Sequence, residues 1–240
     1  MQPGNEENEM IVAEQKPIED IKRMLKDKKK VLAVGCGTCV AVCFAGGKRE
    51  TGVLSSALRI TTELEGSPVQ VEESTVQRQC EPEYIESLRE VLDEYDAILS
   101  LGCGVGVQTL AEHFPDTQIL PALNTKFMGG PVQQGVWEER CQGCGNCMLD
   151  QTGGVCPISR CAKQLMNGPC GGTSGDGRCE VDPETPCAWA LIWERMDRLG
   201  NQEELLEVKP VKDWSTSRDG GLRRIVRKDV MKPQLNEDDN

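Results

Sequence analysis

Cysteine is the residue type with the clearest chemistry in this sequence, and eight of the 13 cysteines fall within residues 141–187. Thiolates are soft ligands that bind iron–sulfur clusters or zinc, and two-residue spacings bring successive sulfurs to one centre without long loops. The run Cys141-x2-Cys144-x2-Cys147, followed by Cys156-Pro157, is close to a ferredoxin run with a longer gap before its last cysteine. The pattern predicts metal binding by Cys141, Cys144, Cys147, Cys156, Cys161, Cys170, Cys179 and Cys187.

Segments typical of strands and of helices alternate in the first half of the chain. Short continuous apolar runs are typical of strands that are buried on both faces, and stretches with helical periodicity lie between them. This alternation predicts an α/β fold with a small doubly wound parallel sheet of about four strands. The expected strands lie at 31–34, 69–71, 97–101 and 118–120, and the expected helices begin near Pro17, Val53 and Pro82.

The other five cysteines lie close to the carboxyl ends of these expected strands. Cys36 and Cys39 follow the first strand, Cys80 ends the loop after the second, and Cys103 follows the third. The carboxyl ends of parallel strands meet at one edge of a sheet, so these four are the favoured ligands of one cluster. Cys43 is the expected spare, although it shares a helix face with Cys39 and could replace it. The alternative is that Cys43 and Cys80 are simply buried thiols.

Glycines flank two of these cysteines in Gly-x-Gly turns, which also occur in dinucleotide-binding loops. The third glycine of that fingerprint is replaced by Val40 in one turn and by Val107 in the other, so a nicotinamide site is not expected. Small residues instead leave room for a cluster, and the sulfurs of that cluster would accept hydrogen bonds from backbone N–H groups. The predicted cofactor-binding glycines are Gly35, Gly37, Gly102 and Gly104.

The sequence predicts four regions. Residues 121–140 are expected to be a crossover that the Gly129-Gly130-Pro131 segment interrupts. The region that follows is rich in loops and short of aliphatic residues, so metal binding is expected to supply much of its folding free energy. The regions are a flexible N-terminus at 1–16, an α/β cluster-binding domain at 17–130, a cysteine-rich iron–sulfur domain at 131–200, and an extended tail at 201–240 that could bind a partner.

Composition excludes several classes of protein. A formal net charge of -12 argues against a nucleic-acid binder, and no stretch approaches the roughly 20 apolar residues of a membrane span. The opening MQPGNEENEM lacks a secretory signal, so we expect a cytoplasmic protein without disulfides. The only imidazole, His113, is expected to be structural or solvent-facing, and no catalytic residue is predicted.

Several motifs together resemble the methylenetetrahydrofolate reductase C-terminal domain family. They are VGCGTCV at 34–40, CFAGG at 43–47, LSLGCGVG at 99–106, the Cys141 triplet, and NGPCGG at 167–172. The resemblance covers about residues 31–195. It implies a non-catalytic iron–sulfur subunit that exchanges electrons with the flavin of a catalytic methylenetetrahydrofolate reductase subunit, in the acetyl-CoA pathway of anaerobes. It also implies that heterodisulfide-reductase-like electron-transfer subunits can attach.

Thirteen cysteines make three sets of four with one left over, so two or three [4Fe-4S] clusters are expected. Zinc at one site uses the same ligands, and the spacing leaves the partition of the eight later cysteines open. One alternative is therefore a structural zinc scaffold without a redox role. Another is a dithiol oxidoreductase that works through Cys36 and Cys39, which would leave Cys80 and Cys103 unexplained.

Overall fold

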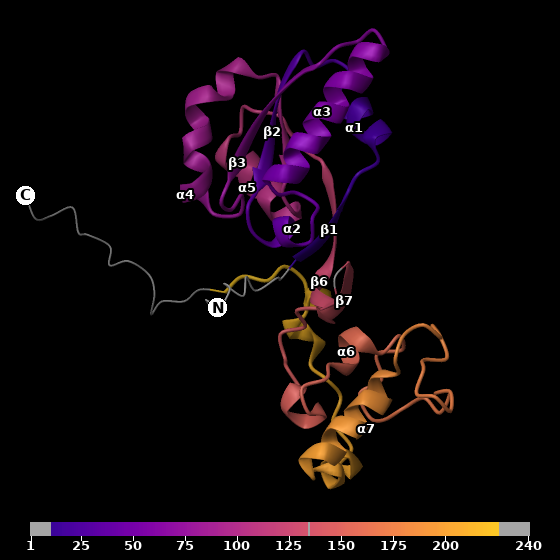
Figure 1. The fold of residues 1–240 in the computed structure, drawn as a ribbon. Helices are drawn as coiled ribbons and strands as arrows, with labels where there is room; N and C mark the ends of the chain where they lie inside the picture. Colours follow the sequence, from indigo (N-terminus) through magenta and orange to yellow (C-terminus); the bar gives the residue numbers. More distant parts are fainter. Residues whose placement is uncertain (1–10, 134, 226–240) are drawn as a thin grey trace, which may run out of the picture. The chain divides into compact units, whose positions relative to one another are not determined.

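The computed structural model of this chain describes residues 11–133 and 135–225. The chain divides into two compact units, Met1–Arg140 and Cys141–Asn240, which we call unit 1 and unit 2 (Figure 1). The expected flexible segment 1–16 and the expected tail 201–240 lie partly outside the described residues.

Unit 1 contains the predicted parallel sheet. Its four strands run in the order β3-β2-β4-β5, and every neighbouring pair is parallel. Within this sheet the chain first forms the central strand β2, then adds β3 on one side of it, and then adds β4 and β5 on the other side. This is the doubly wound pattern. The strands are β2 (Lys30–Cys36), β3 (Gln70–Val76), β4 (Ala97–Leu101) and β5 (Ile119–Pro121).

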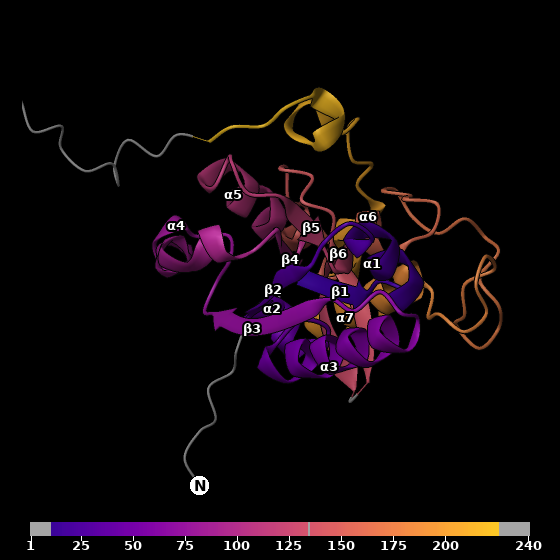
Figure 2. The same ribbon diagram turned by 90° about the horizontal axis from the view of Figure 1, so that it is seen from above.

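Helices cover both faces of this sheet, as Figure 2 shows. Alternate residues of β2 enter different cores: Val31 and Ala33 pack in one apolar cluster, and Leu32 and Val34 pack in the other. The first cluster includes residues of α1 (Ile18–Leu25) and α3 (Lys48–Leu64). The second includes residues of α4 (Pro82–Ile85), η1 (Glu86–Glu94) and α5 (Gly104–His113). The continuous apolar run in β2 is thus explained by burial on both sides.

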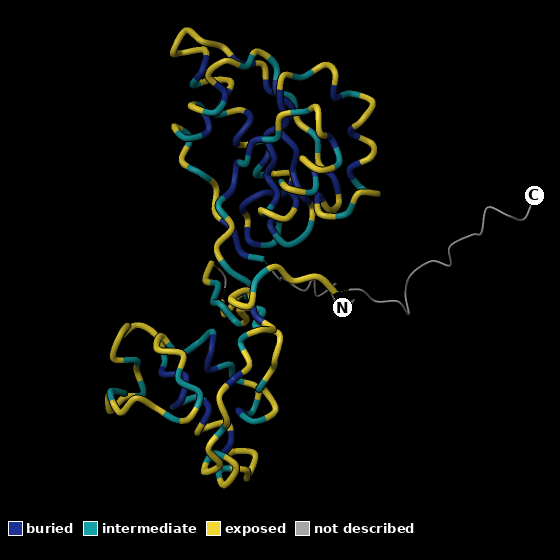
Figure 3. Tube along the Cα trace, turned by 180° about the vertical axis from the view of Figure 1, so that it is seen from behind, coloured by how far each residue is buried: buried dark blue, intermediate teal, exposed yellow. Residues whose placement is uncertain are grey.

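Helix α1 begins directly after Pro17, as the sequence predicted. Its apolar stripe is buried through Ile21 and Leu25, because this spacing places both on one helix face. Helix α3 does the same with Leu54 and Leu58. Figure 3 shows the resulting concentration of buried residues along the strands of unit 1.

Two segments of unit 1 differ from expectation. Residues 11–15, expected in the flexible lead-in, form β1 (Ile11–Gln15), and the expected crossover is mostly strand. Strands β6 (Leu123–Gln133) and β7 (Val136–Cys141) join β1 in a second sheet of order β1-β6-β7. Gly129 lies within β6 and does not interrupt the strand. A Cβ at this position would lie 1.9 Å from the carbonyl oxygen of Glu138 in β7. Glycine is needed at this close approach of two strands.

Unit 2 is rich in loops, and its described residues form one small apolar cluster of Cys187, Trp189, Ile192 and Met196. The described part of the expected extended tail, residues 201–225, is not extended throughout, since it contains three short 3-10 turns. No helix within the described residues is long and apolar enough to cross a membrane. The elements are η2 (Leu149–Thr152), α6 (Pro157–Arg160), α7 (Ala188–Leu199), η3 (Gln202–Leu206), η4 (Trp214–Thr216) and η5 (Arg218–Gly220).

Candidate functional site

Three cysteines of unit 1 meet at the carboxyl edge of the parallel sheet. Cys36 is the last residue of β2, Cys103 caps α5 directly after β4, and Cys80 ends the loop that follows β3. Cys80 is exposed, so the alternative that it is a buried thiol is wrong. Partial desolvation of its sulfur raises the pKa of Cys80, and the neighbouring thiols of Cys36 and Cys103 raise it further. Strands β2 and β4 are neighbours at the switch point of the sheet, the position at which α/β folds bind ligands.

Gln79, which the sequence did not single out, holds the Cys80 loop in place. Its side chain is fully buried, donates to the carbonyl of Val34 at 2.8 Å, and accepts from the hydroxyl of Ser100. A Cβ at position 102 would lie 2.3 Å from the Gln79 side-chain oxygen, so Gly102 makes room for it. The amide therefore links β2 and β4 directly beneath Cys80. No local periodicity marks such a residue.

The other two cysteines of unit 1 are placed differently. Cys39 is the first residue of α2 (Cys39–Val42) and is half-buried. The thiol of Cys43 is buried and donates toward the carbonyl oxygens of Val40 and Ala13, at 3.6 and 3.7 Å. The structure thus brings together three of the four favoured cysteines, Cys36, Cys80 and Cys103, while Cys43 packs against β1. Their role as metal ligands stays a prediction.

The predicted cofactor-binding glycines already have partners in the protein. The amide of Gly37 donates to Val76 at 3.0 Å, that of Gly102 to the Ser100 hydroxyl at 3.2 Å, and that of Gly104 to the Thr125 hydroxyl at 2.8 Å. Gly35 is required by packing, because a Cβ there would lie 2.5 Å from the Thr51 hydroxyl. Packing requires glycine at positions 35 and 102, whereas a Cβ at Gly37 or Gly104 would make only ordinary contacts. Contact of these four glycines with a cofactor stays a prediction.

Four cysteines of unit 2 line one small cavity of about 20 Å³. Cys161 follows α6, and Cys187 immediately precedes α7. A short hairpin positions the residues between them: the amide of Cys187 donates to Gly177 at 2.8 Å, and the amide of Cys179 donates to Thr185 at 3.0 Å. The cavity therefore collects thiols that are up to 26 residues apart in the sequence, namely Cys161, Cys170, Cys179 and Cys187.

Hydrogen-bond donors surround two of these sulfurs. Burial raises the pKa of Cys187, but the hydroxyl of Thr173 at 3.1 Å and the first backbone N–H groups of α7 outweigh it, so the pKa lies below its usual value. The amide of Gly172 donates to the sulfur of Cys170 at 3.4 Å. The donors around Cys187 favour its thiolate, which is the form that binds metals. The thiol of Cys170 also donates to the Glu180 carboxylate at 3.5 Å. The sequence pattern did not indicate a role for Thr173 either.

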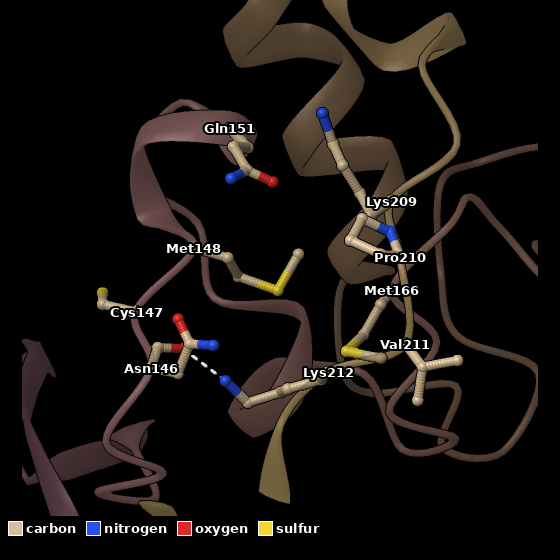
Figure 4. Close-up of a pocket in the computed structure, with 9 residues that line it drawn as sticks. All are labelled: Asn146, Cys147, Met148, Gln151, Met166, Lys209, Pro210, Val211 and Lys212. Atoms are coloured by element: carbon tan, nitrogen blue, oxygen red, sulfur yellow. Dashed lines mark hydrogen bonds between the residues drawn. The ribbon is translucent and has the colours of Figure 1, made fainter.

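The remaining cysteines of unit 2 precede this cavity in the chain. The amide of Gly143 donates to the sulfur of Cys141 at 3.3 Å, and the thiol of Cys144 donates toward the carbonyl of Asn146 at 3.7 Å. Cys147 lines a different cavity, beside Lys212 (Figure 4). Cys156 caps the start of α6, the one-turn helix that has Cys161 at its other end. Cys156 is not among the residues that line the four-thiol cavity.

None of the 13 cysteines forms a disulfide. Within residues 11–133 and 135–225, no three Cys, His, Asp or Glu side chains are gathered closely enough to bind a single metal ion. His113 lies in a surface network, where its Nε2 contacts Glu86 and Arg89. Arg89 and then His113 lower the pKa of Glu86 to about 2. These contacts agree with the expected structural role of the imidazole.

Comparison with known proteins gives one match. Residues 120–215 match a protein-family model described as methylene-tetrahydrofolate reductase C terminal. The resemblance seen in the sequence motifs is thereby confirmed for this segment, which contains all eight cysteines of unit 2. Searches among curated proteins and among solved structures found no match.

Proposed function

We propose that this chain is an iron–sulfur electron-transfer subunit that serves a methylenetetrahydrofolate reductase. The observation that carries the proposal is the cavity lined by four thiols, because it lies within the segment that matches the reductase family. Four cysteines are the ligand number of a cubane cluster, in which each cysteine binds a different iron atom. The cavity of about 20 Å³ has room for about one water molecule, so the lining loops would have to move apart to take up a cluster. A bound cluster would supply reversible one-electron storage. The protein residues hold the cluster, orient it and limit its contact with water.

The cavity also suggests how the eight later cysteines are shared. One centre would take Cys161, Cys170, Cys179 and Cys187. The second would take the four cysteines that remain, which are Cys141, Cys144, Cys147 and Cys156. This second set keeps the Cys-Pro ending of a ferredoxin run. The third centre would lie at the sheet edge of unit 1, with Cys36, Cys39, Cys80 and Cys103 as ligands and Cys43 outside the set.

An electron carrier needs no acid, base or nucleophile of its own. The proposed partner is a flavin-containing catalytic subunit, which would carry out the reduction of the folate while this chain passes electrons to or from the flavin. Heterodisulfide-reductase-like subunits are the proposed neighbours on the other side of the electron path, and the cytoplasm is the proposed location. The family match supports the choice of reductase.

Metal analysis of anaerobically purified protein tests the proposal. Three clusters predict about 12 iron and about 12 sulfide per chain, a brown colour and EPR signals after reduction. Cys179→Ser should remove about one third of the iron, whereas the matched variant Cys43→Ser should keep all of it. Colourless protein that carries only zinc would instead identify a structural scaffold. Thiol-exchange activity that survives removal of iron would identify a dithiol enzyme.

A further inference from the structure

Two segments of unit 2 face one another across a cavity of about 120 Å³. One is the loop of residues 146–151, and the other is residues 209–212, which we call the strap. The side chain of Asn167 fixes the start of the strap, because it accepts from the amide of Lys209 at 2.7 Å and donates to the carbonyl of the same residue at 3.1 Å. Beyond the strap, the Thr216 hydroxyl donates to the carbonyl of Cys144 at 3.0 Å. Hydrogen bonds before and after the strap therefore fix its position in unit 2.

The two lysines of the strap lie at opposite ends of this cavity. Figure 4 shows the amine of Lys212 toward one end and that of Lys209 toward the other. The side chains of Met148 and Met166 lie between them, and the sulfur of Cys147 points away from the cavity. The cavity thus has positive charge at its two ends and an apolar middle.

Lys212 is buried without an ion-pair partner among the described residues. It is only 9% exposed, and its ammonium donates to the carbonyl of Asn146. Hydrogen bonds from Ser215 lower the pKa of neighbouring Asp213, and the charge of Lys212 lowers it further, but the Asp213 carboxylate is bonded to Ser215 and not to the ammonium. An ammonium has three N–H donors, and an uncompensated buried charge is costly. Lys212 therefore has both donors and a positive charge left for an anion.

The other end of the cavity is also short of negative charge. The Lys209 side chain is 14% exposed, and its amine lies 3.9 Å from the carboxylate of Glu207, whose side chain is 80% exposed. An ion pair of this length with an exposed partner contributes little. The side-chain amides of Asn146 and Gln151 line the same cavity and make no hydrogen bond within the part of the chain that the structure describes. Their N–H groups are further donors for a ligand.

We propose that this cavity binds a small aliphatic dicarboxylate. A ligand with two negative ends and an apolar middle is the complement of a cavity with two positive ends and an apolar middle. One carboxylate accepts from Lys212 and the other from Lys209, and hydrogen bonds between charged groups are about twice as strong as neutral ones. The methylene chain lies on Met148 and Met166, whose flexible side chains adapt to its shape. The inference does not rest on the proposed function, because it involves no metal.

Calorimetric titration of the anaerobically purified full chain with glutarate tests the proposal, at constant ionic strength so that screening does not change. Glutarate should bind saturably at millimolar or lower concentration. Butyrate has one carboxylate, and inorganic phosphate has no methylene chain to span the cavity, so both should bind about tenfold more weakly or worse, the factor for one lost charge-assisted hydrogen bond. Equal binding of butyrate, tighter binding of phosphate, or no saturable binding of glutarate would overturn the proposal.

Variants locate the site. Lys212→Met and Lys209→Met should each weaken glutarate binding about tenfold, whereas Arg218→Met removes a charge from an exposed position outside the strap and should leave binding unchanged. An equal loss in Arg218→Met would show nonspecific attraction and refute the site. If Lys212→Met does not fold, Lys209→Met and hydrogen exchange of the parent protein decide, because glutarate should slow exchange in peptides from the strap and from residues 146–151; unchanged exchange there would contradict the proposal. A lack of iron in the same preparation would refute only the proposed function.

Discussion

Removal of metal should unfold unit 2 and leave unit 1 folded. The reason is the unequal distribution of buried apolar side chains. In unit 2 the large buried apolar residues are Ile158, Trp189, Ile192 and Met196, whereas in unit 1 helices pack on both faces of a sheet. Burial contributes about 1.5–3 kcal/mol per side chain, so these four contribute about 6–12 kcal/mol before the entropy of ordering the loops is subtracted.

A structural metal site contributes free energy on the same scale. Sites with four protein ligands bind zinc with about 10–16 kcal/mol, and most domains have a net stability of only about 5–15 kcal/mol. The free energy lost with even one metal centre should therefore exceed the net stability that the apolar cluster of unit 2 can supply. In unit 1 the candidate ligands lie at the ends of strands and helices at the edge of the sheet, so metal loss there should loosen this edge without melting the strands.

Hydrogen exchange measured by mass spectrometry, before and after anaerobic chelation, separates the two units. Peptides from α7 should lose their protection, while peptides from β2 and β4 should keep it. Chelator already saturated with metal is the control for nonspecific effects. Protection of α7 that survives complete metal removal would refute the reasoning, because burial alone would then suffice. Simultaneous loss of protection in β2 would show that the units do not fold independently.

Three further predictions concern individual side chains. Cys103→Ser should remove about one third of the bound iron, and the EPR signals of the unit 2 clusters should persist; loss of all signals would mean that the centres are wrongly assigned. Gln79→Leu should lower the free energy of unfolding by about 1–3 kcal/mol in denaturant melts, because two buried polar groups lose their partner; an unchanged midpoint would contradict the bridging role of Gln79. Thr173→Val should make the potential of one cluster more negative, since the Cys187 sulfur loses a donor, whereas Thr185→Val should leave every potential unchanged. A shift of equal size in both variants would argue against a local effect.

The parallel sheet could be predicted because its signals are local. The apolar run of β2 shows burial on both faces, and Pro17 marks the start of α1. The expected break at Gly129 was wrong for a physical reason. A glycine in the sequence indicates either a turn or a close approach, and only the pairing of β6 with β7 shows that this one lies opposite Glu138.

The sequence by itself determined the prediction of metal chemistry, since 13 cysteines at these spacings could act as soft metal ligands. Only the tertiary structure decided which cysteines line one cavity, because a short hairpin brings Cys179 and Cys187 to the same cavity as Cys161 and Cys170. The bond between Lys212 and Asn146 likewise joins residues 66 positions apart. Such contacts depend on long-range packing, which local spacing and periodicity do not encode.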